Sequence, residues 1–144
     1  MQISEVTYLG NLRTACKHLK SGDTFITDAP TDNNGKGEAF SPTDILVTSL
    51  ASCAITIIGI YCNKNKITFE NCEASVQKLM GNNPRKVDQI IIEMKLSENN
   101  WDEATLNKVI EAARSCPVEL TLKNNVQISK KGKKGCHLWI TPCT

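Results

Sequence analysis

The chain has 144 residues, with 17 basic and 15 acidic side chains and a formal net charge of +2. A chain of this length can bury a hydrophobic core of its own, and we expect a single domain over residues 1–144. The nearly balanced charge and the scattered aromatic residues exclude the basic, aromatic surface that is typical of nucleic-acid binding.

The first part of the chain is predicted to form a meander of three short strands. These strands are expected over residues 3–9, 13–19 and 24–27, with turn signals at 10–11 and 21–23. No basic segment followed by an apolar one begins the chain, so no secretory signal is predicted and a cytoplasmic location is expected. A loop rich in glycine and asparagine follows over 28–40, where it can act as a lid beside the next helix.

A long apolar helix is predicted from Ser41 to Asn63. Ser41 is expected to cap its start, with Pro42 in the first turn and Asp44 completing a capping box. No charged residue stands between Asp44 and Lys64, and the helix is apolar on all sides, so we expect it to be buried on every side. Serine and threonine dilute the segment, so burial in a protein core is favoured over a membrane span.

The rest of the chain alternates strands and helices. The expected elements are strands over 67–76 and 87–96, a helix opened by a capping box at 100–103, a break at 115–117, a short helix over 118–122, and strands over 126–130 and 138–141. This order predicts an α+β fold, with antiparallel sheets packed around two central helices. One small sheet cannot cover a helix that is apolar on all sides, so a homodimer that supplies a second sheet is expected.

Seven cysteines are present, an odd number that cannot pair completely within one chain. No CxxC motif occurs and neither histidine has a zinc-finger spacing, so no metal site is predicted. Cys53 lies among small residues in the middle of the apolar helix, where desolvation alone would raise the pKa of its thiol and make it an inert core residue. Cys116 lies at the helix break, immediately before Pro117.

Two segments carry a resemblance to a known family. SPTDILVTSLASC places Pro42 eleven residues before Cys53, and AARSCPVELTL contains a CPV element at Cys116. In these segments, and in the order of its elements over essentially the whole chain, the sequence resembles the OsmC/Ohr family of thiol-dependent hydroperoxide reductases. The resemblance implies an OsmC-like fold, an intertwined homodimer, and reduction of organic hydroperoxides in oxidative stress defence without a cofactor or metal.

The same resemblance implies roles for individual residues. Cys53 would be the peroxidatic cysteine that becomes a sulfenic acid, and Cys116 the resolving cysteine that forms a disulfide with it. A dithiol, of lipoyl type in the Ohr branch, would then reduce the disulfide. Arg13 would match the family arginine that holds the thiolate and lowers the pKa of the Cys53 thiol.

The sequence departs from the family pattern at one position. The glutamate that follows the motif proline is replaced by Thr43, which leaves Asp44 and Glu38 as candidate carboxylate partners of Arg13. An alternative to the peroxidase is a non-enzymatic, redox-sensing or small-ligand-binding dimer of the same fold. In either case the remaining cysteines are expected to be bystanders, namely Cys16, Cys62, Cys72, Cys136 and Cys143.

Overall fold

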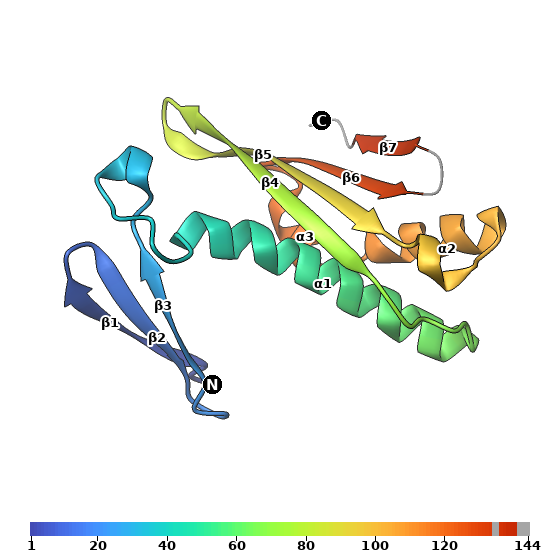
Figure 1. Cartoon of the computed structure of the whole chain (residues 1–144), viewed down its shortest axis with the longest axis horizontal. Coiled ribbons are helices and arrows are strands. Elements are labelled where there is room, and N and C mark those ends of the chain that lie inside the picture. The colour runs from blue at the N-terminus through green and yellow to red at the C-terminus, as the bar shows by residue number, and fades with distance from the viewer. Residues whose placement is uncertain (134–135, 141–144) are drawn as a thin grey trace. The chain divides into compact units, whose positions relative to one another are not determined.

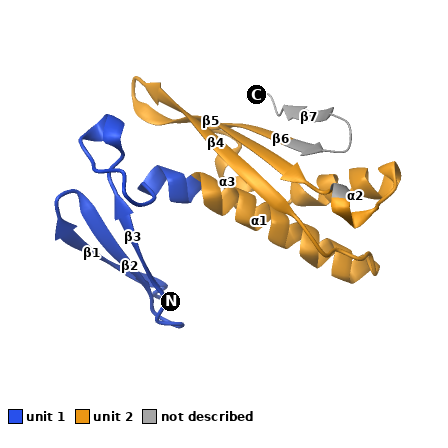
Figure 2. Ribbon diagram, viewed as in Figure 1, with its two compact units in different colours: residues 1–46 blue, residues 47–144 orange. Residues whose placement is uncertain are grey.

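The computed structural model describes residues 1–133 and 136–140 (Figure 1). The chain divides into two compact units, Met1–Leu46 and Val47–Thr144 (Figure 2). Its larger elements are β1 Ser4–Gly10, β2 Arg13–His18, β3 Thr24–Asp28, α1 Pro42–Asn65, β4 Glu73–Asn82, β5 Arg85–Lys95, α2 Glu103–Ala113, α3 Pro117–Leu122, β6 Gln127–Lys133 and β7 Cys136–Ile140. The single domain expected for the whole chain stays a prediction.

The first unit contains the three predicted strands as an antiparallel sheet in the order β1-β2-β3. Asn11 and Leu12 form the turn between β1 and β2 with φ values of 53° and 62°. Positive φ at both central residues is the geometry of hairpin turns whose twist matches that of the strands. The predicted meander is therefore confirmed, and its first turn lies one residue later than the turn signal at 10–11.

The predicted capping box at the start of α1 is confirmed. The Ser41 N–H donates to Asp44 Oδ2 at 2.8 Å, and the Asp44 N–H donates to Ser41 Oγ at 3.1 Å. These two bonds satisfy backbone donors at the helix start that have no partner within the helix. The helix then continues without interruption to Asn65, where Lys66 takes a positive φ of 56°.

Only one side of α1 is fully buried within the chain, which differs from the expected burial on every side. The buried stripe has helical spacing and comprises Val47, Leu50, Ala51, Ala54, Ile58 and Cys62. On another side, Ile60 is 58% exposed. By length and composition α1 could also cross a membrane, but core helices of soluble proteins pass the same test.

The second unit holds a four-stranded sheet in the order β4-β5-β6-β7. β5 and β6 pair in parallel, from Gln89 with Gln127 to Met94 with Gly132, which corrects the expectation of purely antiparallel sheets. The reason is the connection: α2 and α3 carry the chain back so that β6 runs in the direction of β5. The helices lie on one face of this sheet (Figure 1).

The core of the second unit lies between this face and the helices. β5 alternates between its two faces, so that Ile90, Ile92 and Met94 are buried against the helices. The stripe of α1 belongs to the same cluster, as do the buried residues of α2, which are Leu106, Val109, Ile110 and Ala113. The apolar spacing of α2 therefore identifies the face that packs, whereas the uniformly apolar sequence of α1 does not single out its buried stripe.

The starts of α2 and β4 are among the boundaries that differ from the sequence prediction. Asp102, not Asn100, caps α2, because its Oδ1 accepts the Thr105 N–H at 2.7 Å while Asn100 adopts a positive φ of 52°. Hydrogen bonds from Thr105 also lower the pKa of Asp102. β4 begins at Glu73 and not at Ile67.

The segment before β4 is held by a tryptophan instead of by strand pairing. The Trp101 Nε1–H donates to the Thr68 carbonyl at 2.9 Å, and the Phe69 and Trp101 rings lie 5.8 Å apart.

Cys143 and the last residue of the final predicted strand, Thr141, lie outside the described residues.

Replacement of Leu50 by alanine tests the core. Leu50 is fully buried, so Leu50→Ala is expected to lower the free energy of unfolding by about 2–5 kcal/mol, through lost burial and the cavity left behind. Leu79 is 51% exposed, and Leu79→Ala is the matched control, with an expected loss below about 1 kcal/mol. Urea unfolding measures both, and equal losses would contradict this description of the core.

Candidate active site

Two of the predicted site residues meet within the second unit. Cys53 lies midway along α1 and is partly exposed, and Cys116 is fully buried at the residue that precedes α3. The Cys116 thiol hydrogen-bonds to the Cys53 sulfur. Two thiols far apart in the sequence are thus neighbours in the structure, with Cys53 on the more accessible side.

The surroundings of Cys116 favour its protonated form. Burial raises the pKa of the Cys116 thiol, and the hydrogen bond to Cys53 raises it further. The backbone N–H groups of Val118 and Glu119, at the start of α3, lower this pKa but do not offset the burial. Cys116 therefore keeps its proton, which it can donate to the Cys53 sulfur.

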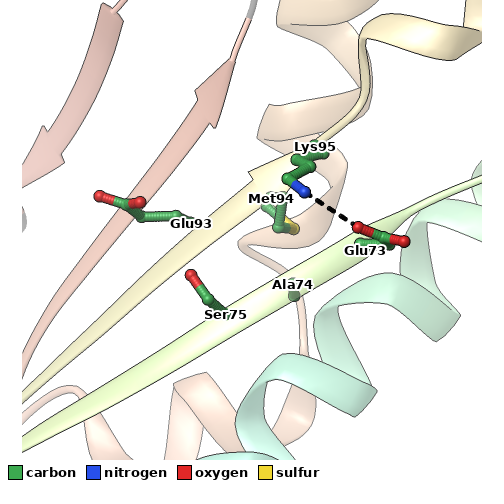
Figure 3. A pocket seen from close by; sticks show the side chains of 6 residues that line it. All are labelled: Glu73, Ala74, Ser75, Glu93, Met94 and Lys95. Carbon is green, nitrogen blue, oxygen red and sulfur yellow. Dashed lines mark hydrogen bonds and ion pairs between the residues drawn. The ribbon is translucent and has the colours of Figure 1, made fainter.

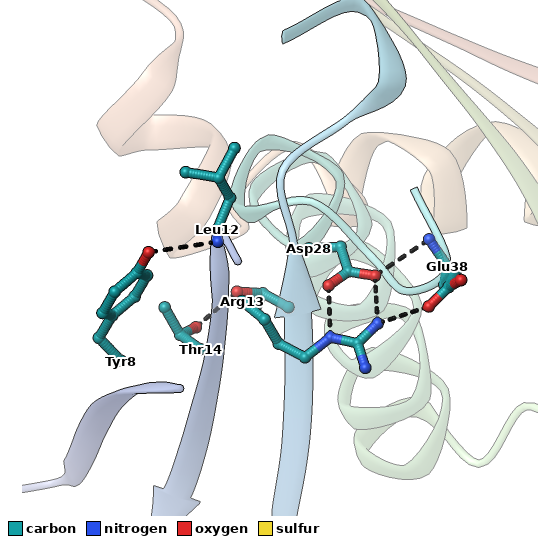
Figure 4. Close-up of polar contacts among 7 residues, drawn as sticks. Tyr8, Leu12, Arg13, Thr14, Asp28 and Glu38 are labelled. Carbon is teal, nitrogen blue, oxygen red and sulfur yellow. Dashed lines mark hydrogen bonds and ion pairs between the residues drawn. The ribbon is translucent and has the colours of Figure 1, made fainter. Parts of the chain in front are cut away.

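A second polar site in the first unit is built around Arg13 (Figure 4). Arg13 and Asp28 are directly opposite each other in the β2–β3 register. Arg13 Nε donates to Asp28 Oδ1 at 2.6 Å, and Nη2 donates to Oδ2 at 2.8 Å. The same Nη2 donates to Glu38 Oε2 at 2.8 Å. A bidentate pair of this kind fixes the plane of the guanidinium as well as its position.

Asp28 is buried, and both of its carboxylate oxygens accept hydrogen bonds. It is 1% exposed, and its Oδ2 also accepts the Glu38 N–H at 3.0 Å. The hydrogen bonds from Arg13 hold the pKa of Asp28 below its usual range, and those to Asp28 and Glu38 raise the pKa of Arg13. Both groups therefore stay charged at neutral pH.

The loop after β3 brings Glu38 to this pair. The Gly35 N–H donates to the Pro30 carbonyl at 3.0 Å, and the Gly37 N–H donates to the Ala29 carbonyl at 3.3 Å. A Cβ at Gly35 would overlap the Ala29 backbone, so only glycine fits this close approach. The loop predicted as a lid is thus folded tightly back onto the end of β3.

The two candidate carboxylates have different surroundings. Glu38 binds Arg13, whereas Asp44 closes the capping box of α1. Thr43, at the position of the family glutamate, places its hydroxyl 3.1 Å from the Ser41 hydroxyl. Asp28, which forms the strongest contact with Arg13, was missed because the sequence assigns it to the loop; the register of the β2–β3 hairpin is the signal that identifies it.

Arg13 and Cys53 belong to different units, so the proximity implied by the resemblance stays a prediction.

Burial raises the pKa of Cys62 and of Cys72, which makes both thiols poor nucleophiles. Among residues 1–133 and 136–140, no group of three metal-ligating side chains is arranged to hold an ion.

A shallow pocket lies on the sheet of the second unit, away from the candidate residues (Figure 3). Its lining comes from three cross-strand pairs of β4 and β5, which are Glu73 with Lys95, Ala74 with Met94 and Ser75 with Glu93. Lys95 and Glu73 form an exposed ion pair at 3.0 Å across it. None of the sequence-predicted site residues lines this pocket.

The Arg13–Asp28 pair is expected to make stability depend on pH. Because the pKa of Asp28 is lowered in the folded state, its contribution is present at neutral pH and is lost as the pH falls from about 4 through the folded-state pKa. Asp28→Asn should therefore destabilise the protein at pH 7, and the difference from the unmodified protein should shrink in acid. Urea unfolding across this range measures the effect.

The exposed partner provides the control for this prediction. The Glu38 side chain is 63% exposed, so Glu38→Gln should change stability much less than Asp28→Asn at pH 7. Equal effects of the two substitutions, or a difference for Asp28→Asn that stays constant with pH, would contradict the electrostatic account.

The OsmC-like protein family model matches residues 35–131. A solved structure from Psychrobacter arcticus 273-4, whose name refers to osmotic stress and a detoxification response, is 44% identical with a TM-score of 0.83, covering 92% of this chain and 94% of that one. The organic hydroperoxide resistance protein OsmC of Legionella pneumophila is 15% identical with a TM-score of 0.74, covering 92% and 97%.

A third similar structure, the organic hydroperoxide resistance protein OhrB of Bacillus subtilis, is 15% identical with a TM-score of 0.66, covering 92% of this chain and 98% of that one. No curated protein matches the sequence. The family model covers well over half of the chain, and the Psychrobacter structure matches nearly all of it. The chain is therefore a member of the OsmC-like family, as its SPTDILVTSLASC and CPV segments indicate.

Proposed function

We propose that the protein is a thiol-dependent peroxidase that reduces organic hydroperoxides, with Cys53 as the attacking thiol and Cys116 as the resolving thiol. The observation that carries this proposal is the contact between the two thiols, one partly exposed and one buried. Membership of the OsmC-like family supports it, as do the names of the Legionella and Bacillus relatives, which refer to hydroperoxide resistance.

The proposed reaction has three balanced steps. The Cys53 thiolate attacks a peroxide oxygen, the O–O bond breaks, and the leaving alkoxide takes up a proton to become an alcohol while the sulfur becomes a sulfenic acid. The Cys116 sulfur then attacks the Cys53 sulfur, the S–O bond breaks, and the hydroxyl group leaves with the Cys116 proton as water. A dithiol reduces the resulting disulfide by exchange and is itself oxidised to a disulfide.

Arg13 is proposed to act in the first step. Its guanidinium would hold the Cys53 thiolate and polarise the peroxide, and its bidentate bond to Asp28 would fix its orientation. The pair with Asp28 and Glu38 performs the orienting role that the glutamate at the Thr43 position has in the family pattern. A guanidinium beside the Cys53 thiolate would offset the cost of placing this negative charge in apolar surroundings.

A homodimer, a cytoplasmic location and a lipoyl-type dithiol reductant complete the proposal. Apolar side chains remain exposed on the chain in two places that a second copy would cover. On one face of the three-stranded sheet they include Val6, Tyr8 and Phe25, of which Val6 and Phe25 both flank Cys16 in register. On α1 they are Leu46 and Ile60.

Variants of the three proposed catalytic residues should fail at different steps. With cumene hydroperoxide and a dithiol, Cys53→Ser should abolish turnover, and Cys116→Ser should leave the first oxidation intact but accumulate sulfenic acid. Arg13→Ala should slow the first oxidation on the order of 100-fold, because a charged group that acts on the transition state is lost. Stopped-flow oxidation with mass spectrometry separates these steps.

Controls come from groups that the mechanism does not use. Cys62→Ser and Arg85→Ala should keep the kinetics of the unmodified protein. If the unmodified protein consumes no hydroperoxide with any dithiol, the peroxidase is refuted and the redox-sensing or ligand-binding dimer becomes the better account. Peroxide oxidation that reaches Cys62 before Cys53 would also contradict the assignment.

The dimer is tested by solution mass. One chain has a mass of 15.9 kDa, and light scattering at micromolar concentration should give twice this value. Val6→Lys/Phe25→Lys places charges on the apolar face of the first unit and should shift the equilibrium toward monomer. Thr24→Lys, on the opposite face of the same sheet, is the control. A stable monomer of the unmodified protein would exclude the proposed assembly.

A further inference from the structure

A buried ion pair links both sides of the helix break that carries Cys116. Lys130 lies on β6 and Glu119 lies on α3, with exposed fractions of 4% and 6%. Lys130 Nζ donates to Glu119 Oε2, and it also donates to the Ala113 carbonyl, at the end of α2, at 3.3 Å. One ammonium group thus bonds to residues before and after Cys116.

The second of these bonds leads directly to the backbone of Cys116. The Ala113 carbonyl that accepts from Lys130 also accepts the Cys116 N–H at 3.3 Å. On the other side, the Leu120 N–H donates to the Cys116 carbonyl at 3.0 Å, and the Glu119 N–H is directed at the Cys116 sulfur. A shift of either helix end would therefore move the thiol.

The sheet fixes where this ammonium lies. Lys130 pairs with Ile92 in the parallel β5–β6 register, two residues after Ile128 pairs with Ile90. Ile128, Ile90 and Ile92 are all buried on the face that the helices cover. A lysine at such a position is costly unless it is paired, and an apolar residue would fill it without that cost. The pair therefore has a role other than burial.

We propose that Lys130 and Glu119 are positioning residues for Cys116: they hold the break between α2 and α3 so that the Cys116 thiol stays on the Cys53 sulfur. This inference rests on the proposed function and adds to it, because it concerns the second step, in which the Cys116 sulfur displaces the hydroxyl group of the Cys53 sulfenic acid as water. Neither residue touches the peroxide, so the first step does not depend on them.

The test replaces the pair by apolar residues of similar size. A single change would leave one buried charge without its partner and could unfold the chain, so the main variant is Lys130→Met/Glu119→Leu, in which no charge is left unpaired. The control is Lys95→Met, which breaks the exposed Lys95–Glu73 pair at the end of the neighbouring strand β5.

Two measurements are made on the full chain. After one equivalent of cumene hydroperoxide, quenched-flow mass spectrometry follows the sulfenic acid at Cys53 and then the Cys53–Cys116 disulfide. In the double variant the first rate should be unchanged, and the second should fall on the order of ten- to hundred-fold, as for a reacting group displaced by about 1 Å. Separately, equilibration in glutathione buffers should show less of this disulfide in the double variant than in the unmodified protein.

The outcomes separate this inference from the proposed function. Unchanged disulfide formation in the double variant overturns the inference alone, as does an equal loss in both steps, which indicates a general structural role. If the unmodified protein forms the disulfide in glutathione but consumes no peroxide, the proposed function fails, and the glutathione equilibrium of the double variant still decides the inference. If no Cys53–Cys116 disulfide forms under either condition, both are overturned.

Discussion

The packing of α1 on the four-stranded sheet is the constraint on which the rest of the second unit depends. A helix without a charged residue between Asp44 and Lys64 must bury part of its surface, and each fully buried leucine or isoleucine contributes about 1.5–3 kcal/mol. The stripe that is buried includes Ala54, and Cys53 lies beside it. The cysteine is therefore held at the edge of the core, where its side chain interacts with Cys116 and the residue is partly exposed.

The Arg13–Asp28 and Lys130–Glu119 ion pairs are each arranged around a buried carboxylate and a cation. Asp28 and Glu119 are each less than a tenth exposed, and each is paired with a basic side chain from a strand. In both cases a backbone group is included, the Glu38 N–H in the first unit and the Ala113 carbonyl in the second. Buried charges that are satisfied in this way fix the loop or helix end to which they bond, because any movement would leave a charge without its partner.

The sequence alone was sufficient to predict the features of the fold that depend on local patterns. The uncharged apolar run identified α1, the spacing of apolar residues identified α2, and Ser41 with Asp44 identified the start of α1. Asp102 was misjudged because two adjacent capping signals compete at the start of α2, and the backbone conformation of Asn100 decides between them. Local patterns therefore give the existence of an element more reliably than its first residue.

Features that depend on pairing between distant segments could not be predicted in this way. The parallel alignment of β5 with β6 follows from how the crossover packs, and periodicity within each strand does not report it. The role of Asp28 needs the register of a hairpin, and the burial of Lys130 needs the register of β6 against β5. The cysteines were identified by resemblance to a family, since a lone buried thiol is by itself an ordinary core residue.

The crossover between β5 and β6 also has a consequence for how the chain folds. Parallel pairing across two intervening helices is a non-local contact, and such contacts form late because a long loop must close before they contribute energy. Cys116 lies within this crossover, so it reaches Cys53 only when most of the second unit is in place. In a nascent chain the shorter loop would favour Cys62 over Cys116 as the partner of Cys53, so selectivity for Cys116 is a property of the finished fold.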